Sequence, residues 1–455
     1  MRSDVGMSKH YTVRPTKFTL RFAPAEQATV HGGQFAVAAV LERFDLRRRV
    51  QALSALDPRT HTYKGFEPCV YAYGALFSLT SGGCTLAAVE GLDGDAALKA
   101  YLGVKKFPDQ STVGEWLRAV GEPGWQALRQ LNRDFVAWTL AQAEPARYQH
   151  GGRTECFFDD TQVEVYGRTF EGADFNYNKA LALGWQTLWV GPLLADSVLG
   201  PPLPVGSELP GLLQQNHALW NKAHSYLYAD SGSSSGADLT QISAHCDAWS
   251  VSYNRWTSAL ERQARDLPES AWSAPVERKG RKGEPLQEQY AWLRHQPEGC
   301  ATPQAFAVAR SKAAEDLFWH HHFVVTHAAD GTPQAVCERH RLKGDRERLF
   351  SEVLSDLDLH HPPCQALAAN RVYYALATLA YNVLQALKLI WLPAEVQPQR
   401  VRTLIHQLLL VPVRLYRHAR RLAACFFATT PWVQWWRRFL AEVLPRCGLA
   451  PPCRT

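Results

Sequence analysis

One stretch, Cys156–Gly167, constrains the fold more than any other because its residues alternate between two faces and a glycine closes it. This pattern predicts a β-strand. Asp159 interrupts the face that begins with Phe157 and is otherwise mostly apolar, whereas Asp160 belongs to a polar face that we expect to be solvated. A carboxylate among buried neighbours is costly unless a cation or hydrogen bonds compensate it. We therefore expect Asp159 to have a partner elsewhere in the chain.

The length and composition indicate an ordinary globular protein with two to four domains, since the 455 residues are 46% hydrophobic and 20% charged. The net charge of +6 allows a polyanionic partner without demanding one. None of the ten cysteines has the spacing of a zinc site. Apolar stretches such as Leu408–Val413 are too short to span a bilayer and no leader opens the chain, so we expect a soluble cytoplasmic protein with no membrane partner.

Residues 1–150 are predicted to form a mainly helical N-terminal region after a loosely ordered start of about 22 residues. The apolar spacing predicts helices at Phe35–Phe44, Tyr71–Leu79, Thr85–Val89, Thr112–Val120 and about 124–143. Ser111 is the expected N-cap of the fourth helix. The region is either a scaffold or a DNA-binding region that uses exposed basic residues such as Arg47, Arg48, Arg49, Lys105 and Lys106.

After the first strand, strand-like and helical patterns alternate. Trp185–Pro192 and Ser225–Ala229 predict strands, and helices are expected at Leu212–Trp220 and about 237–246. This alternation indicates an α/β sheet with a crossover helix. In such sheets the functional residues lie mostly at the carboxyl ends of the strands. Asp230 stands at such an end, although Asp-Ser-Gly is also ordinary turn chemistry.

Residues 249–322 differ in pattern and are predicted to form an inserted β-rich module. A basic turn in this module is expected to contact DNA through Arg278, Lys279, Arg281 and Lys282, although a solvated hairpin tip explains these charges nearly as well. One of four tryptophans is hypothesised to stack on a base flipped out of the DNA: Trp249, Trp256, Trp272 or Trp292. His320, His321 and His322 would alternate between faces and therefore cannot converge on one metal ion.

The next segment returns to a strand at Phe323–Thr326 and then predicts a helix that begins at Gly344-Asp345. Glu347 lies at the head of the buried stripe of this helix, although a surface salt bridge is the default for a helical glutamate. Glu352 and Asp356 fall closer to its outer face.

Two further helical regions complete the chain. Ala366–Leu389 predicts a long helix, in which Asn370, Tyr381 and Asn382 are unusual polar members. Val401–Leu444 is expected to be helical and basic, which suggests a nearby phosphate backbone.

Asp159, Asp230 and Glu347 together are the carboxylate set that a two-metal phosphoryl-transfer site needs. The interval between Asp230 and Glu347 is long enough to hold the inserted module.

Several motifs carry a resemblance to a known family. They are Asp159-Asp160-Thr161 with Gly167, Ala229–Gly232, Phe323–Thr326, Gly344–Glu347, and Ala369-Asn370 with Leu379–Asn382. In this order, from about Phe18 to the C-terminal helices, the chain resembles the DDE transposases of bacterial insertion sequences, and in particular the family numbered 1380.

The resemblance implies a ribonuclease-H-like α/β core interrupted by the β-rich insertion. The core would comprise residues 151–248 and 323–395, flanked by the helical regions 1–150 and 396–455. Asp159, Asp230 and Glu347 would bind two Mg²⁺ ions, with Mn²⁺ as a substitute. Such enzymes cut the inverted repeats of their element with water and join the freed 3′-hydroxyls to target DNA. They work as homodimers in a synaptic complex, here in the cytoplasm at the nucleoid.

The sequence departs from the family around Glu347. Related transposases often carry Tyr, Arg and Lys where this chain has His340, Lys343 and Leu354, and Arg348 replaces a customary Asn. Lys343, Arg348 and His340 are predicted to contact DNA, although Lys343 lacks the bidentate fork of arginine. These changes keep open the alternative of a catalytically decayed DNA-binding protein. A metal-dependent nuclease that cuts without joining is a third possibility.

Overall fold

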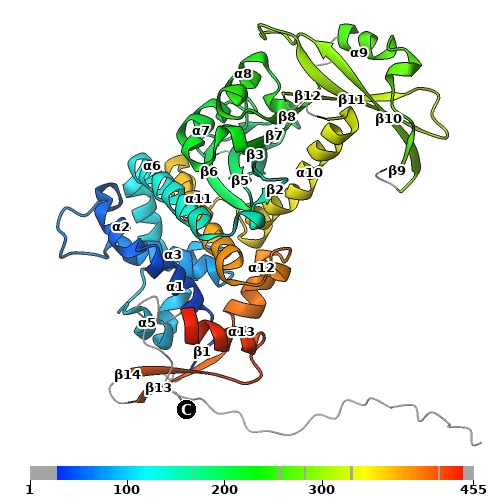
Figure 1. Ribbon diagram of the computed structural model, residues 1–455. Coiled ribbons are helices and arrows are strands. Elements are labelled where there is room, and N and C mark those ends of the chain that lie inside the picture. Colours follow the sequence, from blue (N-terminus) through cyan, green and yellow to red (C-terminus); the bar gives the residue numbers. More distant parts are fainter. Residues whose placement is uncertain are drawn as a thin grey trace, which may run out of the picture.

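Figure 1 shows the computed structural model, which describes residues 28–443 except 168, 255–257, 281–282, 328–330 and 419–420. A large mixed sheet with helices on both faces forms its centre, so the predicted α/β class is confirmed. Helices of the N-terminal region lie on one side of this sheet, and a module of long strands extends from the opposite side (Figure 1).

Eleven strands form the sheet in the order β4-β5-β3-β7-β8-β12-β11-β10-β9, with β6 paired to β5 and β2 to β3. The inner strands are β2 (Gln149–His150), β3 (Arg153–Glu164), β4 (Asp174–Phe175), β5 (Leu181–Val190), β6 (Leu193–Gly200), β7 (Ser225–Ala229) and β8 (Trp249–Tyr253). β7 is parallel to β3 and β8, whereas β5 is antiparallel to β3 and β6. The predicted strands at β3, β5 and β7 are confirmed, and β5 begins earlier than expected.

The outer strands are β9 (Val276–Lys279), β10 (Pro285–His295), β11 (Gln304–Ala313) and β12 (His320–Thr326). β12 pairs antiparallel with β8, so these strands continue the inner sheet rather than forming a sheet of their own. Helix α9 (Ser258–Arg265) packs on one face of this extension, and α10 (Pro333–Ser351) packs on the other. α10 then runs back toward the inner sheet (Figure 1).

Helices cover both faces of the inner sheet. α11 (Leu367–Ala386) lies against the face of Trp185 and Trp189, which contact Tyr374 and Tyr381. α7 (Leu209–Asn216) covers the opposite face, where Gln186 accepts a hydrogen bond from the backbone of Glu208, and α8 (Gly236–His245) packs beside α7.

The N-terminal region is helical as predicted. Its helices are α1 (Gln34–Arg43), α2 (Leu46–Ala52), α3 (Pro68–Thr80), α4 (Leu86–Gly91), α5 (Ala96–Leu102) and α6 (Gln110–Gln142). The two helices expected at Thr112–Val120 and about 124–143 are confirmed: within α6 the backbone at Gly121 is non-helical, with a φ of +48°, and separates two helical segments two residues before Pro123. The N-cap of α6 is Asp109 rather than Ser111, because the Asp109 carboxylate accepts the Thr112 N–H at 2.8 Å. α6 and α3 both pack against α11.

The prediction of a wholly helical C-terminal region is wrong. α12 (Val401–Leu404) continues into a π-helical turn, but β13 (Val413–His418) and β14 (Arg421–Phe426) then form a hairpin that pairs with β1 (Ala28–Thr29). Val413 and Leu415 are buried and alternate with exposed Arg414 and Tyr416, which is the period of a strand. α13 (Val433–Arg438) follows the hairpin.

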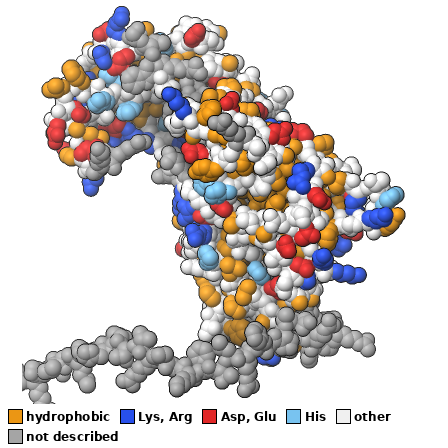
Figure 2. Space-filling model, turned by 180° about the vertical axis from the view of Figure 1, so that it is seen from behind, with side chains coloured by type: hydrophobic (Ala, Val, Ile, Leu, Met, Phe, Trp, Pro, Cys, Tyr) orange, Lys and Arg blue, Asp and Glu red, His pale blue; other side chains and the backbone are white. Residues whose placement is uncertain are grey.

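Figure 2 shows the module of β9–β12 overhanging the body, so that the molecule is hollowed beneath it, with Lys and Arg side chains along the wall of the hollow. Within the described residues, no helix is long and apolar enough to cross a membrane.

Candidate active site

Strand β3 places Asp159 at the centre of the sheet, on the face toward α10 and α11. Thr187 lies opposite Asp159 on β5 and donates a hydrogen bond to its backbone carbonyl at 3.2 Å. Burial raises the pKa of the Asp159 carboxyl to about 6, and Lys343 only partly offsets this effect. The carboxylate that interrupts the apolar face therefore has the cationic partner that the sequence predicted.

Asp230 follows directly after β7, which pairs in parallel with β3 so that Phe157 and Tyr228 are neighbours. Asp230 begins a short 3₁₀ turn, but its side chain does not cap that turn. The turn-chemistry interpretation therefore does not account for its carboxylate, which instead points to the same cation as Asp159.

That cation is Lys343 of helix α10. Its Nζ lies 2.8 Å from Oδ2 of Asp230 and 3.4 Å from Oδ1 of Asp159. The side chain of Lys343 is 8% exposed, against 15% for Asp159 and 58% for Asp230. A single ammonium thus holds together two carboxylates that are far apart in the sequence.

Helix α10 begins eleven residues earlier than predicted, at Pro333, because Thr332 caps it by accepting the Ala335 N–H at 3.2 Å. Gly344 therefore lies inside the helix and does not begin it. Glu347 is one turn after Lys343, and residues four apart share a helix face. The side chain of Glu347 lies outside the described part of the structure.

A cavity of about 370 Å³ lies beside the two aspartates. Its lining is Asp159, Thr161, Asp230, Lys343, Phe350, Ser351, Leu354, Ser355 and His360. On α10 the cavity-lining residues lie one turn before and one or two turns after position 347. Thr161, Ser351, Ser355 and His360 were not predicted, and a sequence pattern gives no sign that they meet here.

Asp160 is not on a solvated face. The loop before α7 covers it, the Gly206 N–H donates to it at 3.2 Å and Gln162 Nε2 donates at 3.0 Å. Burial raises its pKa to about 6. Because Asp160 faces the opposite side of the sheet from Asp159, it does not belong to the cavity.

His340 and Arg348 do not reach the carboxylates. Both ring nitrogens of His340 are 2.8 Å from serine hydroxyls of β8, Ser250 and Ser252. Burial lowers the pKa of His340 to about 4, so the ring is neutral at pH 7. Arg348 donates to the Pro398 carbonyl and lies 3.5 Å from Glu352.

Glu352 and Asp356 are buried, contrary to the expectation that they lie near the outer face. They stand in a π-helical turn after α10, which shifts them relative to a regular helix. Asp356 pairs with Arg400 at 2.8 Å, and Glu352 lies 4.0 Å from Lys388. Asp356 is thus held by a structural ion pair, whereas the carboxylate oxygens of Glu352 are buried without a hydrogen-bond partner among the described residues.

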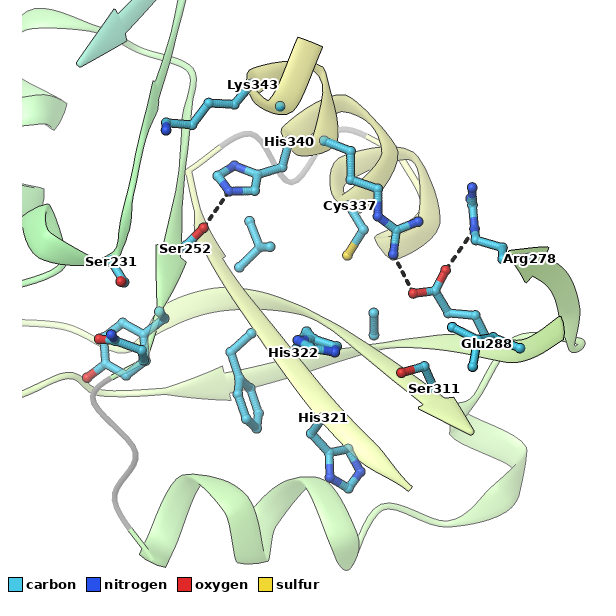
Figure 3. Close-up of a pocket in the computed structure, with 18 of the residues that line it drawn as sticks. Ser231, Ser252, Arg278, Glu288, Ser311, His321, His322, Cys337, His340 and Lys343 are labelled. Atoms are coloured by element: carbon cyan, nitrogen blue, oxygen red, sulfur yellow. Dashed lines mark hydrogen bonds and ion pairs between the residues drawn. The ribbon is translucent and has the colours of Figure 1, made fainter. Parts of the chain in front are cut away.

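A second, larger cleft of about 790 Å³ leads from Asp230 along α10 to the outer strands. Figure 3 shows Lys343 and Ser231 at one end, Arg278 and Glu288 at the other, and Cys337 and His340 of α10 between them. Arg278 and Lys279, two of the predicted DNA contacts, line this cleft. Arg281 and Lys282 lie outside the described residues.

The tryptophans of the outer module are mostly structural. Trp249 and Trp272 are buried, so neither offers a face to a base in this conformation. Trp292 is half-buried and packs on the cluster beneath α10, and Trp256 lies outside the described residues. His321 and His322 both line the cleft, but His321 is buried and pairs with Glu261 of α9 whereas His322 is exposed, as expected for adjacent residues of a strand.

Among the described side chains, no group of three or more histidine, cysteine, aspartate or glutamate residues converges as a metal site. Two carboxylates nevertheless converge on one cation, Lys343, and carboxylate oxygens are the ligands that Mg²⁺ prefers. The donor set at Asp159 and Asp230 therefore fits a divalent ion, with Glu347 on the adjoining helix turn.

Comparison with known proteins identifies the family. No curated protein matches the sequence. The family model described as transposase DDE domain group 1 matches residues 15–446, nearly the whole chain and all the elements that build the cavity. The protein belongs to the DDE transposases of group 1, a family of enzymes that cut and transfer DNA.

Proposed function

We propose that this protein cuts the terminal inverted repeats of a bacterial insertion sequence and joins the 3′-hydroxyls to target DNA. The observation that carries this proposal is the convergence of Asp159 and Asp230 on Lys343, on the helix that also bears Glu347. The retained carboxylate pair disfavours the alternative of a decayed DNA-binding protein. On the motifs described above, we assign the element to the family numbered 1380.

The topology supports a ribonuclease-H-like core. The inner strands follow the order β6-β5-β3-β7-β8. The first three strands pair antiparallel with one another, and β7 and β8 then continue the sheet parallel to β3. Asp159 lies on the middle strand, and Asp230 follows the strand beside it. In α/β proteins, catalytic and binding residues lie mostly at the carboxyl ends of strands such as β7.

Asp159, Asp230 and Glu347 would hold two Mg²⁺ ions, or Mn²⁺ in their place. When bound, such ions lower the pKa of water and offset the charge that develops on the phosphate. The residues of the chain hold the carboxylates in place and exclude water from one side of the cavity through Phe350 and Leu354. At neutral pH the Asp159 carboxyl is mostly ionised, because its raised pKa of about 6 still lies below 7.

The partners that we propose are double-stranded DNA, as element end and as target, and a second copy of the chain in the synaptic complex. The enzyme would act on the bacterial chromosome in the cytoplasm. The module that overhangs the hollow in Figure 2 supports a DNA path past the cavity, because basic side chains line the wall.

The test is an assay with Mg²⁺, labelled DNA carrying the native element end, and a target plasmid. Wild type is run beside Asp159→Asn, Asp230→Asn and Glu347→Gln. Glu164→Gln, an exposed acid at the end of β3, is the matched control. We expect cleavage and joining by wild type and control. Each of the other variants should lose at least about 10³-fold in rate, because metal ligation supplies several kcal/mol to the transition state.

Two outcomes would contradict the proposal. Cleavage without joined product in wild type would favour a hydrolytic nuclease. Near-normal cleavage by any one carboxylate variant would remove that residue from the site.

A further inference from the structure

The far end of the cleft contains a buried acid held between two arginines. Glu288 of β10 pairs with Arg278 of β9 at 2.7 Å and with Arg341 of α10. Tyr290 donates to Glu288 at 2.6 Å and accepts from Arg278 at 3.0 Å. The pKa of Glu288 is held below its usual value because these partners outweigh the effect of burial. We call Arg278, Glu288 and Arg341 the Glu288 clamp.

The clamp presents its positive groups to the cleft and keeps its negative group beneath them. The Glu288 side chain is 5% exposed, whereas Arg278 is 32% and Arg341 42% exposed. A guanidinium carries five donors, and only some of them are used by Glu288, Tyr290 and, for Arg278, Glu338. The exposed Lys279 lines the same end of the cleft.

We propose that the Glu288 clamp binds a backbone phosphate of the DNA whose bond is cut at Asp159, Asp230 and Glu347. This inference rests on the proposed function and names a contact of the same site. Arginine is suited to this role because its planar fork matches two phosphate oxygens. The carboxylate of Glu288 is a positioning group, since it fixes both forks without contacting DNA.

Helix α10 sets the distance between the clamp and the carboxylates. Arg341 and Glu347 lie on the same unbroken helix, six residues apart and so about 9 Å along its axis. For a duplex whose axis runs along α10, at about 3.4 Å per nucleotide, this axial separation corresponds to roughly two to three nucleotides. The clamped phosphate is therefore expected two to three nucleotides from the cut.

The first test measures the affinity for end DNA against salt, with EDTA present so that no cleavage is needed. A failure of the clamp is then distinct from a failure of the proposed function. Arg278→Gln and Arg341→Gln should each bind about tenfold more weakly and lose about 0.9 from the slope of log affinity against log salt. The control is Arg294→Gln, which replaces an exposed arginine farther along β10. This variant should change the DNA affinity and the salt slope only as much as the loss of any one distant positive charge would.

The variant Glu288→Gln distinguishes binding by positioned arginines from binding by overall electrostatic attraction. Removing an acid makes the protein more positive, so simple attraction predicts tighter DNA binding. The clamp predicts weaker binding, since the two forks lose the group that fixes them. Equal or tighter binding by a folded Glu288→Gln protein would overturn the proposal.

Arg341→Lys provides a second measurement if Glu288→Gln does not fold. It keeps the charge but loses the fork, so affinity should fall while the salt slope stays the same. A purely structural ion cluster would lower the melting temperature without changing the affinity of the folded protein. Inorganic phosphate alone should not raise the melting temperature of wild type; if it does, the clamp is a site for a small anion.

Neutral methylphosphonates at single positions of the end DNA locate the contact. Substitution two to three nucleotides from the cut should weaken wild-type binding and leave Arg341→Gln binding unchanged. An equal loss in both proteins would place Arg341 away from that phosphate.

Discussion

Helix α10 carries two charged clusters with opposite arrangements. At one, two carboxylates share a single ammonium, that of Lys343; at the other, two guanidiniums share the buried carboxylate of Glu288, and Arg278 also pairs with the exposed Glu338. Burial acts on the acids of both clusters. It prevails at Asp159, whose pKa rises to about 6, whereas the partners of Glu288 outweigh it and lower its pKa. The balance between burial and the charged and hydrogen-bonding partners thus decides whether each of these two carboxyls resists or favours ionisation.

This difference fits two separate binding roles for the two clusters along one cleft. A pair of acids short of positive charge attracts a divalent cation, and a pair of arginines around one buried acid attracts an anion.

The largest effect is expected from removing one acid of the aspartate pair, and removing the acid of the other cluster should have a different effect. Asp230→Asn should abolish cleavage in single-turnover assays while end binding stays intact, because binding rests on distributed cations. Glu288→Gln should weaken binding but cut at a near-normal rate once DNA is saturating. If Glu288→Gln lost cleavage at saturation as well, the two clusters would not have separate roles.

Removing the shared ammonium should affect stability and metal affinity in opposite directions. In Lys343→Met, Asp159 and Asp230 repel each other, so the metal-free protein should lose about 1–3 kcal/mol, a moderate value because Asp230 is largely exposed. Mn²⁺ should then raise the melting temperature of the variant more than that of wild type, since no ammonium competes with the ion. Lys279→Met, which lines the cleft away from the aspartates, is the control. An identical Mn²⁺ shift in wild type and Lys343→Met would refute the competition.

The two clusters should respond to pH with opposite sign. Asp159 binds its proton more tightly when folded, so wild type should lose stability relative to Asp159→Asn as pH rises from about 4 to 6. Glu288 binds its proton less tightly when folded, so wild type should lose stability relative to Glu288→Gln as pH falls below its usual pKa of 4.5. Urea unfolding of the metal-free proteins measures both differences. Slopes of the same sign would mean that the charged partners of Asp159 and Glu288 do not set their ionisation in opposite directions.

The smallest effect concerns Gly344, which lies on α10 between the clusters and lines the cleft. An added Cβ would meet no atom within 4 Å, so Gly344→Ala should stabilise the helix by about 0.5–1 kcal/mol. It should also weaken DNA binding a few-fold if the backbone of the DNA approaches there. Gly211→Ala in α7, an equally open position away from the cleft, should give the stability gain alone. Equal DNA affinities for both variants would show that Gly344 leaves no room that the substrate uses.

The sequence predicted the parts of this site that depend on local pattern. Asp159 stood out because it breaks a period of two, and Asp230 because it ends a buried strand. Glu347 stood out because it heads the buried stripe of its helix, and the resemblance supported its role. The structure adds that Lys343, one turn earlier, meets both aspartates.

The remaining features depend on tertiary contacts. The pairing of Glu288 with Arg341 requires the packing of α10 on β10, which no spacing reveals. The start of α10 was misplaced because Gly344-Asp345 resembles a helix start, whereas the actual cap is Thr332-Pro333. The hairpin at β13 and β14 was missed although Val413 and Leu415 alternate with polar neighbours, because the surrounding leucines and arginines also suit a helix.

The pairing of β12 with β8 makes the outer module an extension of the inner sheet, and α10 crosses both. The loop between β11 and β12, residues 314–319, lies at a tip of this module, away from the inner sheet (Figure 1). In evolution such tips are free to vary, since loops tolerate substitution and insertion better than the elements they join. Changes confined to such tips would therefore leave unaltered the strand pairing and the helix that bring Asp159, Asp230 and Lys343 together.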